Sequence, residues 1–190
     1  MTHIALFSSG NGTNAENIAN YFNKNSDIEV AVIVSNKQNA FVHQRAKALN
    51  IPSYTFSRNE IMEGTQLLRL LSDYKIDYII LAGFLLKIPS ILLNNFPNRI
   101  INIHPALLPK YGGKGMYGDN VHKKVVEMKD AQSGITIHYV NEKYDEGKII
   151  FQESCPISAK DTYNDVAQKI HKLEYTHFPR IIEKVILGKK

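Results

Sequence analysis

The sequence is poor in cysteine, in long apolar runs and, over one stretch, in acidic residues. Cys155 is the single cysteine among 190 residues, so no internal disulfide can form, which suits a reducing cytoplasm. The longest apolar run, residues 78–86, is about half of the ~20 residues that span a bilayer. No basic segment precedes the first apolar run, so we expect no signal peptide. We therefore expect a cytoplasmic protein without a membrane partner.

Basic residues outnumber acidic ones, but they form no stripe interleaved with aromatic residues. The formal net charge of +5 favours anionic partners without identifying them. Without a basic and aromatic stripe we expect no nucleic-acid partner. Several lysines fall on segments with helical spacing, where we expect a solvated face: Lys123, Lys124, Lys169, Lys172, Lys189 and Lys190. With 44% apolar and 22% charged residues, the chain fits a single globular domain, residues 1–190.

Short apolar runs alternate with segments of helical spacing through the first half of the chain. The expected strands are residues 4–8, 29–35, 52–56, 77–83 and 99–104, with helices around residues 18–22, 41–49 and 67–71. The first, second and fourth strands are almost continuously apolar, which indicates burial on both faces. The pattern predicts an α/β fold with a doubly wound, Rossmann-like, mostly parallel sheet and helices on both faces.

The second half follows a different pattern. Residues 133–140 alternate apolar and polar positions, and the run 148–157 follows after a turn, which predicts a C-terminal antiparallel hairpin added to the sheet. A final helix is expected over residues 161–187, with Asp161 or Thr162 as its N-cap. Pro179 is expected to kink or interrupt this helix.

The loop after the first strand, SSGNGTNAEN, carries Gly10, Gly12 and Ala15 in the spacing G-x-G-x-x-A. In a parallel sheet this turn is the usual seat of a phosphate, because glycines allow close approach and free N–H groups begin the helix. A dinucleotide site also needs an acidic residue near the end of the second strand. Residues 30–59 contain no Asp or Glu, and the Lys-Ser/Thr pair of a P-loop is missing. The loop predicts an anion site or a plain glycine turn, and it argues against NAD.

The stretch INIHPALLPKYGG, residues 101–113, points most directly to chemistry. Asn102 and His104 are two apart at the end of an expected strand, so both side chains project from one face at the carboxyl edge of the sheet. An amide donor beside an imidazole suits a developing oxyanion, and the imidazole can also move protons near neutral pH. The alternative is a structural asparagine and a core histidine.

A third polar group for this pair is expected from the turn of the hairpin. The candidates are Glu142, Asp145 and Glu146, of which the last two stand where the second hairpin strand begins. His138, on the preceding strand, either supports the site from behind or is simply buried. The sequence has no Cys/His cluster with zinc spacing and no serine nucleophile elbow, so we expect neither a metal site nor an acyl-enzyme.

With these residues in view, the chain resembles the phosphoribosylglycinamide formyltransferases, folate-dependent enzymes of purine synthesis. The resemblance rests on SGNGTN at 9–14, LAGFLLKI at 81–88, NIHPALLPKYGG at 102–113 and the turn that holds Asp145. It implies transfer of the formyl group of the cosubstrate 10-formyltetrahydrofolate to the amine of N1-(5-phospho-D-ribosyl)glycinamide, in IMP biosynthesis. The amine would attack the formyl carbon directly, through a tetrahedral intermediate and without a metal.

The resemblance assigns roles residue by residue. The implied catalytic residues are Asn102, His104 and Asp145. The implied contacts to the ribonucleotide are Gly12, Thr13, Asn14 and Glu174. The implied contacts to the folate are Arg58, Leu85, Leu86, Lys87, Ile88, Asn102, Tyr139, Val140, Asn141, Glu142, Tyr144 and Asp145. Leu108–Pro109 would be the cis peptide of the family.

The two halves of the domain are expected to divide the work. Residues 1–100 would bind the nucleotide and its phosphate, and residues 101–190 would carry catalysis and the folate. We expect small-molecule partners only, and a monomer or weak homodimer.

The chain departs from the family pattern in places. Leu86 stands where many members carry arginine, and residues 111–120 differ from the usual loop, so no family contact is carried into that loop. The alternatives are another folate-dependent formyltransferase or hydrolase, or a non-catalytic nucleotide-binding module in which Asn102 and His104 are structural. The glycine spacing alone would also fit an NAD-dependent oxidoreductase.

Overall fold

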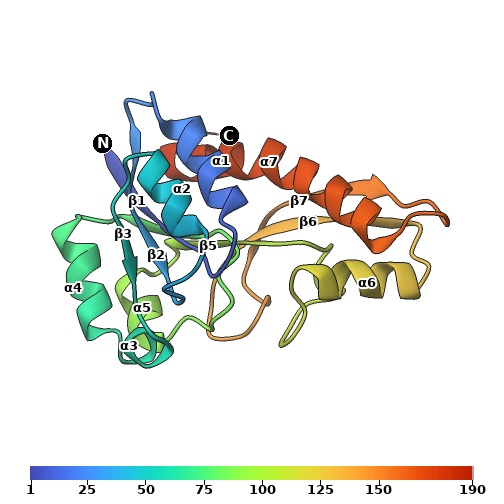
Figure 1. Cartoon of the computed structure of the whole chain (residues 1–190), viewed down its shortest axis with the longest axis horizontal. Coiled ribbons are helices and arrows are strands. Elements are labelled where there is room, and N and C mark those ends of the chain that lie inside the picture. The colour runs from blue at the N-terminus through green and yellow to red at the C-terminus, as the bar shows by residue number, and fades with distance from the viewer. Residues whose placement is uncertain (190) are drawn as a thin grey trace.

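The computed structural model describes residues 1–189, so Lys190, the last residue of the expected domain, lies outside the described residues. Seven strands form one sheet in the order β3-β2-β1-β4-β5-β6-β7 (Figure 1). The strands are β1 (Thr2–Phe7), β2 (Ile28–Ser35), β3 (Ser53–Thr55), β4 (Tyr78–Leu81), β5 (Ile100–His104), β6 (Gln132–Tyr139) and β7 (Ile149–Pro156). Every strand expected from the sequence is present, with ends that differ by a few residues.

The sheet changes direction once, between β5 and β6. Strands β1 to β5 pair in parallel, whereas β6 pairs antiparallel with β5 and β7 pairs antiparallel with β6. This confirms the mostly parallel sheet with a C-terminal antiparallel hairpin. The register between β5 and β6 places Asn102 opposite His138 and His104 opposite Thr136. Polar residues of the two strands therefore lie side by side.

Helices cover both faces of the sheet, as predicted. They are α1 (Thr13–Phe22), α2 (Val42–Ala48), α3 (Arg58–Glu63), α4 (Thr65–Asp73), α5 (Ser90–Asn95), α6 (Asp119–Glu127) and α7 (Tyr163–Leu187). Helices α1, α2, α6 and α7 pack into one apolar core, and α3, α4 and α5 pack into the other (Figure 1). On β1, Ile4 and Leu6 face the first core while Ala5 and Phe7 face the second, and all four are fully buried. Among residues 1–189, no helix is both long and apolar enough to cross a membrane.

Two short helices, α3 and α5, were not expected from the sequence. Helix α3 begins with a capping box, in which Ser57 accepts from the main-chain N–H of Glu60 and the Glu60 carboxylate accepts from the Ser57 N–H. This S-x-x-E signal was present in the sequence. Helix α5 has only six residues, which is too short for a helical periodicity to be recognised in the sequence. It follows Pro89 and has no side-chain cap, so no capping signal marks its start either.

Helix α7 runs through Pro179, so the expected interruption is wrong. The helix begins after Thr162, whose hydroxyl accepts from the N–H of Asp165, and this confirms one of the two expected caps. Proline has no N–H, which leaves the carbonyl four residues earlier, that of Tyr175, without its helical donor. Asn17 of α1 supplies the missing donor, with Nδ2 at 3.0 Å from that oxygen. The helix continues because a neighbouring helix satisfies the freed carbonyl.

Candidate active site

A large cavity, about 810 Å³, opens at the carboxyl ends of β1, β4 and β5. Its walls come from the glycine loop before α1, the segment 82–87 after β4, the end of β5, the loop 113–118 and α7. A smaller cavity of about 70 Å³ shares six lining residues with it: Phe84, Leu86, Lys87, Asn102, Tyr144 and Asp145. An open α/β sheet binds its ligands at this edge.

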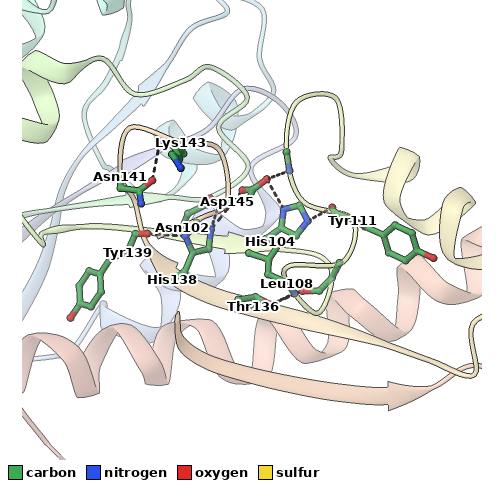
Figure 2. A network of polar contacts seen from close by, with 12 residues as sticks. Asn102, His104, Leu108, Tyr111, Thr136, His138, Tyr139, Asn141, Lys143 and Asp145 are labelled. Atoms are coloured by element: carbon green, nitrogen blue, oxygen red, sulfur yellow. Dashed lines mark hydrogen bonds and ion pairs between the residues drawn. The ribbon is translucent and has the colours of Figure 1, made fainter. Parts of the chain in front are cut away.

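Asn102, His104 and Asp145 all line the large cavity and turn toward one another (Figure 2). The Nδ1 atom of His104 lies 3.6 Å from Oδ2 of Asp145, and the two side chains are only 5% and 13% exposed. The carboxylate therefore faces the imidazole rather than bulk solvent. Charges are screened little at such a buried position, so the pair can stabilise charge that appears beside it.

The turn between β6 and β7 is shaped to bring Asp145 to this point. Asp145 adopts a left-handed backbone with φ of 57°. Two residues later, a Cβ on Gly147 would lie 1.6 Å from the carbonyl oxygen of Tyr139, so only glycine fits where the turn packs back against β6. The N–H of Gly113 then donates to Oδ2 of Asp145 at 2.9 Å. The position of the Asp145 carboxylate is thus set by its own turn and by the loop that follows β5.

His138 fixes the amide of Asn102. Its Nδ1 lies 2.8 Å from the carbonyl oxygen of Tyr139, and since a carbonyl only accepts, Nδ1 carries the proton. Its Nε2 can then accept from Nδ2 of Asn102, at 3.1 Å. Burial lowers the pKa of His138 below its ordinary value, which keeps the ring neutral. His138 is therefore buried, as one of the two interpretations had it, and its side chain also contacts Asn102.

His104 is held from its other side as well. Its Nε2 lies 2.7 Å from the carbonyl oxygen of Tyr111, in the loop that follows β5. The peptide bond Leu108–Pro109, between these two residues, is cis, as the resemblance implied. No signal in the sequence identified the Tyr111 carbonyl as a partner of the imidazole, because any residue offers a carbonyl group.

The other end of the cavity is built around the start of α1. Gly12 has φ of 75°, and a Cβ there would lie 2.5 Å from Cγ2 of Val42 on the neighbouring helix. Helix α1 begins without a side-chain cap, so its first N–H groups, including those of Thr13 and Asn14, have no acceptor within the helix. Gly12, Thr13 and Asn14 all line the cavity. These free donors suit an anion.

Asn14 is linked to α7 by a cluster of polar side chains. Its Nδ2 donates to Oε2 of Glu174 at 3.0 Å, and Nδ1 of His171 lies 2.9 Å from the same oxygen. The Glu174 carboxylate raises the pKa of His171 through this bond, whereas burial and the nearby His171 lower the pKa of His122. Oδ1 of Asn14 and Nδ1 of His122 are buried and find no hydrogen-bond partner in the described part of the chain. Two polar atoms of the cluster are thus left without a partner among the described residues.

The residues expected to contact a folate fall into four groups, according to whether they line the large cavity, the small one, both or neither, and Asn102 and Asp145 line both. Arg58, Leu85, Leu86 and Lys87 line the large cavity, while Ile88, Val140 and Asn141 line the small one together with Leu86 and Lys87. Tyr144 lines both cavities. Tyr139 and Glu142 line neither, and Figure 2 shows the Tyr139 side chain directed away from Asn102 and Asp145. Tyr139 packs instead against the apolar core that contains α7.

Sequence reasoning missed His122 and His171. His171 precedes Glu174 by three residues on α7, so the two side chains share a helix face, a spacing that the sequence did contain. His122 lies on α6 and is brought to the cavity by packing between helices, which no local pattern reveals. In residues 1–189 no three His, Cys, Asp or Glu side chains gather in a way that would hold a metal ion.

Comparison with known proteins places the chain in a family. A family model described as formyl transferase matches residues 2–182. The chain belongs to the formyl transferase family. This confirms the resemblance drawn from the glycine loop and the NIHP stretch.

Two curated members of the formyl transferase family illustrate the similarity. The chain is 38% identical to the chloroplastic phosphoribosylglycinamide formyltransferase of Arabidopsis thaliana over 94% of its own length, and it spans 63% of that protein. It is 36% identical to the phosphoribosylglycinamide formyltransferase of Bacillus subtilis over 98% of its length and 95% of that protein's.

A solved structure from the same family shares the fold. The crystal structure of the phosphoribosylglycinamide formyltransferase of Streptococcus pneumoniae superposes with a TM-score of 0.86 at 33% identity, covering 97% of this chain and 99% of that one. The Rossmann-like architecture predicted from the sequence is therefore also that of a known formyl transferase.

Proposed function

We propose that this formyl transferase moves the formyl group of 10-formyltetrahydrofolate to the amine of N1-(5-phospho-D-ribosyl)glycinamide, which gives the N2-formyl product and tetrahydrofolate in de novo IMP biosynthesis. The observation that carries the proposal is the convergence of Asn102, His104 and Asp145 in a cavity whose far end is an uncapped helix N-terminus. The similar proteins that are named phosphoribosylglycinamide formyltransferases favour this substrate over those of other folate-dependent formyltransferases or a hydrolase.

The reaction is a direct acyl transfer between two nitrogens. The substrate amine attacks the formyl carbon, a new C–N bond forms and a tetrahedral intermediate carries the charge on oxygen. The bond to the folate nitrogen then breaks, and the proton lost by the amine is gained by that leaving nitrogen. The buried site must therefore stabilise an oxyanion and relay one proton.

The three polar side chains supply these two functions. Asn102, whose amide is oriented by His138, donates to the developing oxyanion, and loss of one such donor typically costs about 10²–10³ in rate. His104, whose ring nitrogens lie against the Tyr111 carbonyl and Asp145, stabilises the same oxygen through the charge it carries when protonated, or shuttles a proton. Asp145 lies next to that imidazole and relays the proton from the amine to the leaving nitrogen through water.

The two substrates approach from opposite ends of the cavity. The free N–H groups that begin α1, with Gly12, Thr13 and Asn14, hold the ribonucleotide phosphate, and Glu174 holds its ribose. Leu85, Leu86, Lys87 and Ile88 line the folate pocket, together with Val140, Asn141 and Tyr144 of the hairpin turn, and Arg58 lies near the folate tail. Tyr139, at the end of β6, and Glu142, in the turn that follows, act on the folate pocket by shaping this turn, because neither side chain lines the cavity.

We further propose that residues 1–190 act as one domain. The ribonucleotide phosphate is held mainly by residues 1–100, and catalysis and the hairpin side of the folate pocket come from residues 101–190. The small cavity adjoining the large one takes residues from both halves. The lone, half-buried Cys155 fits the reducing cytoplasm, and the working form is a monomer or weak homodimer.

The experiment that tests the function follows the absorbance of the released folate. The protein is mixed with 10-formyltetrahydrofolate, with and without glycinamide ribonucleotide, and the formylated product is identified by mass spectrometry. Folate release that requires the ribonucleotide supports the proposal. Release without the ribonucleotide would indicate a hydrolase, and no release would indicate a binding module.

A further inference from the structure

The ring of His104 is held by a main-chain group. Its Nε2 lies 2.7 Å from the carbonyl oxygen of Tyr111, and because a carbonyl oxygen can only accept, Nε2 must carry a proton. The other ring nitrogen, Nδ1, then faces Oδ2 of Asp145 at 3.6 Å. The position of one carbonyl group thus decides which ring nitrogen is presented to the carboxylate.

Tyr111 holds its carbonyl in place with an unusual backbone. Its φ is 57°, in the left-handed region that bulky residues rarely adopt. Such a conformation persists only where surrounding contacts hold it. One such contact is made by the hydroxyl group at the end of the Tyr111 side chain.

The hydroxyl of Tyr111 donates to Oδ2 of Asp130 at 2.7 Å. Asp130 lies between α6 and β6, outside the cavity, and its own N–H donates to the carbonyl of Val125 at 3.2 Å. Its side chain is 14% exposed and also accepts from Nζ of Lys110 at 2.6 Å. Burial acts to raise the pKa of Asp130, but the bonds from Lys110 and Tyr111 outweigh it and lower the pKa, so the acceptor is ionised and the bond is charge-assisted.

The same short segment also holds the second catalytic candidate. Two residues after Tyr111, the N–H of Gly113 donates to Oδ2 of Asp145 at 2.9 Å. Residues 111–113 therefore contact both His104 and Asp145 through the main chain, as Figure 2 shows for the Tyr111 side of the network. A shift of this segment would move both partners of the pair at once.

We propose that Asp130 is a positioning residue for formyl transfer. Through the Tyr111 hydroxyl it fixes the carbonyl that orients the His104 ring and sets the tautomer of its neutral form, and through the same segment it sets the distance between His104 and Asp145. The inference rests on the proposed function only where it concerns the effect of Asp130 on the rate. The effect of Asp130 on the tautomer of His104 does not depend on which reaction the site performs.

Tyr111→Phe tests the proposal by removing the hydroxyl and leaving the ring and main chain. We expect kcat to fall about tenfold while both KM values stay within about twofold, because the reacting groups are misplaced but the binding surfaces are not. Asp130→Ala should behave in the same way. Asp130→Asn keeps an acceptor oxygen for the hydroxyl and should retain most of the wild-type kcat.

Nitrogen NMR of the imidazole gives the decisive signal, because a merely structural role would not move it. With ¹⁵N-labelled histidine at alkaline pH, the wild-type protein should show His104 as the Nε2–H tautomer alone. Tyr111→Phe and Asp130→Ala should show a mixture of the two tautomers. The matched control is Tyr21→Phe, which removes a tyrosine–carboxylate bond of the same kind, from Tyr21 to Glu183 at 2.8 Å and remote from the cavity, and should change neither signal nor rate.

Two results would overturn the inference. In the first, His104 keeps a single Nε2–H tautomer in Tyr111→Phe, whether or not kcat falls. In the second, Asp130→Asn loses as much activity as Asp130→Ala although it unfolds at the wild-type temperature. If the wild-type protein transfers no formyl group but the tautomer still depends on Asp130, the proposed function fails and the positioning role stands.

Discussion

The two ends of the cavity differ in how far their polar groups are already paired. At the β5 end, His104 and Asp145 each have a main-chain partner, and Asn102 has His138. At the α1 end, Oδ1 of Asn14 and a buried imidazole nitrogen have no partner within residues 1–189, and the first N–H groups of the helix have no acceptor within the helix.

This difference separates two tasks. Groups that act on a transition state work best when they are fixed before the substrate arrives, because no reorganisation is then needed during the reaction. Groups that hold a substrate need free donors and acceptors. Changes at the β5 end should therefore reduce kcat, and changes at the α1 end should raise the KM for the ribonucleotide.

Asp145→Asn is expected to have the largest effect. It keeps the shape of the side chain but removes the charge next to His104, so we expect kcat to fall by about 10³-fold. Ribonucleotide binding, measured by calorimetry, should stay within about twofold. The matched control is Glu146→Gln, since Glu146 is exposed in the same turn and, within residues 1–189, pairs with Lys143 alone. Wild-type turnover in Asp145→Asn would remove this carboxylate from the mechanism.

Asn14→Ala should have an intermediate effect at the opposite end. The change removes the bond to Glu174 and the unpaired amide oxygen, so we expect the ribonucleotide KM to rise about tenfold. The folate KM and kcat should change little. Asn20→Ala, at an exposed position of the same helix, serves as the control. The phosphate assignment is wrong if the folate KM rises more than the ribonucleotide KM.

The smallest expected effect is on the pH dependence of stability. It involves one buried histidine at each end of the cavity, His138 at the β5 end and His122 at the α1 end. Burial lowers the folded-state pKa of both His138 and His122. At acidic pH the folded protein therefore binds fewer protons than the unfolded chain. The contribution of these two residues to the free energy of unfolding is complete above about pH 6.5 and decreases as the pH falls below that value. His171 acts in the opposite sense: its raised pKa stabilises the fold at low pH, and this contribution is lost as pH rises through the folded value.

Urea unfolding between about pH 7.5 and about pH 5.5 measures this dependence. His122→Gln removes one buried imidazole from the α1 end and should flatten the slope of stability against pH. An unchanged slope in that variant would show that His122 is not held neutral by the fold.

Much of the fold could be predicted where the local sequence pattern determines the secondary structure and burial of a residue. The apolar runs of β1, β2 and β4 predicted strands buried on both faces because a buried parallel strand has no polar side to show. Asn102 and His104 were placed correctly, on one face at the carboxyl end of β5, from their spacing alone.

The remainder depended on contacts between distant segments. The continuity of α7 at Pro179 required a donor from α1, and the tautomers of His104 and His138 required carbonyl groups that any residue could supply. His122 reached the cavity through the packing of α6. Such features come from tertiary structure, so local patterns gave no indication of them.

The proline in α7 has a consequence beyond the helix that contains it. The carbonyl group that lost its helical donor accepts from another helix instead. The donor is Asn17, which lies one turn after Asn14 on α1. The bond from Asn17 joins α1 to α7 next to Glu174, so it helps to set the spacing of these two helices along the wall of the cavity. A residue with an N–H at position 179 would give the Tyr175 carbonyl a donor within its own helix, and α7 would then depend less on its contact with α1.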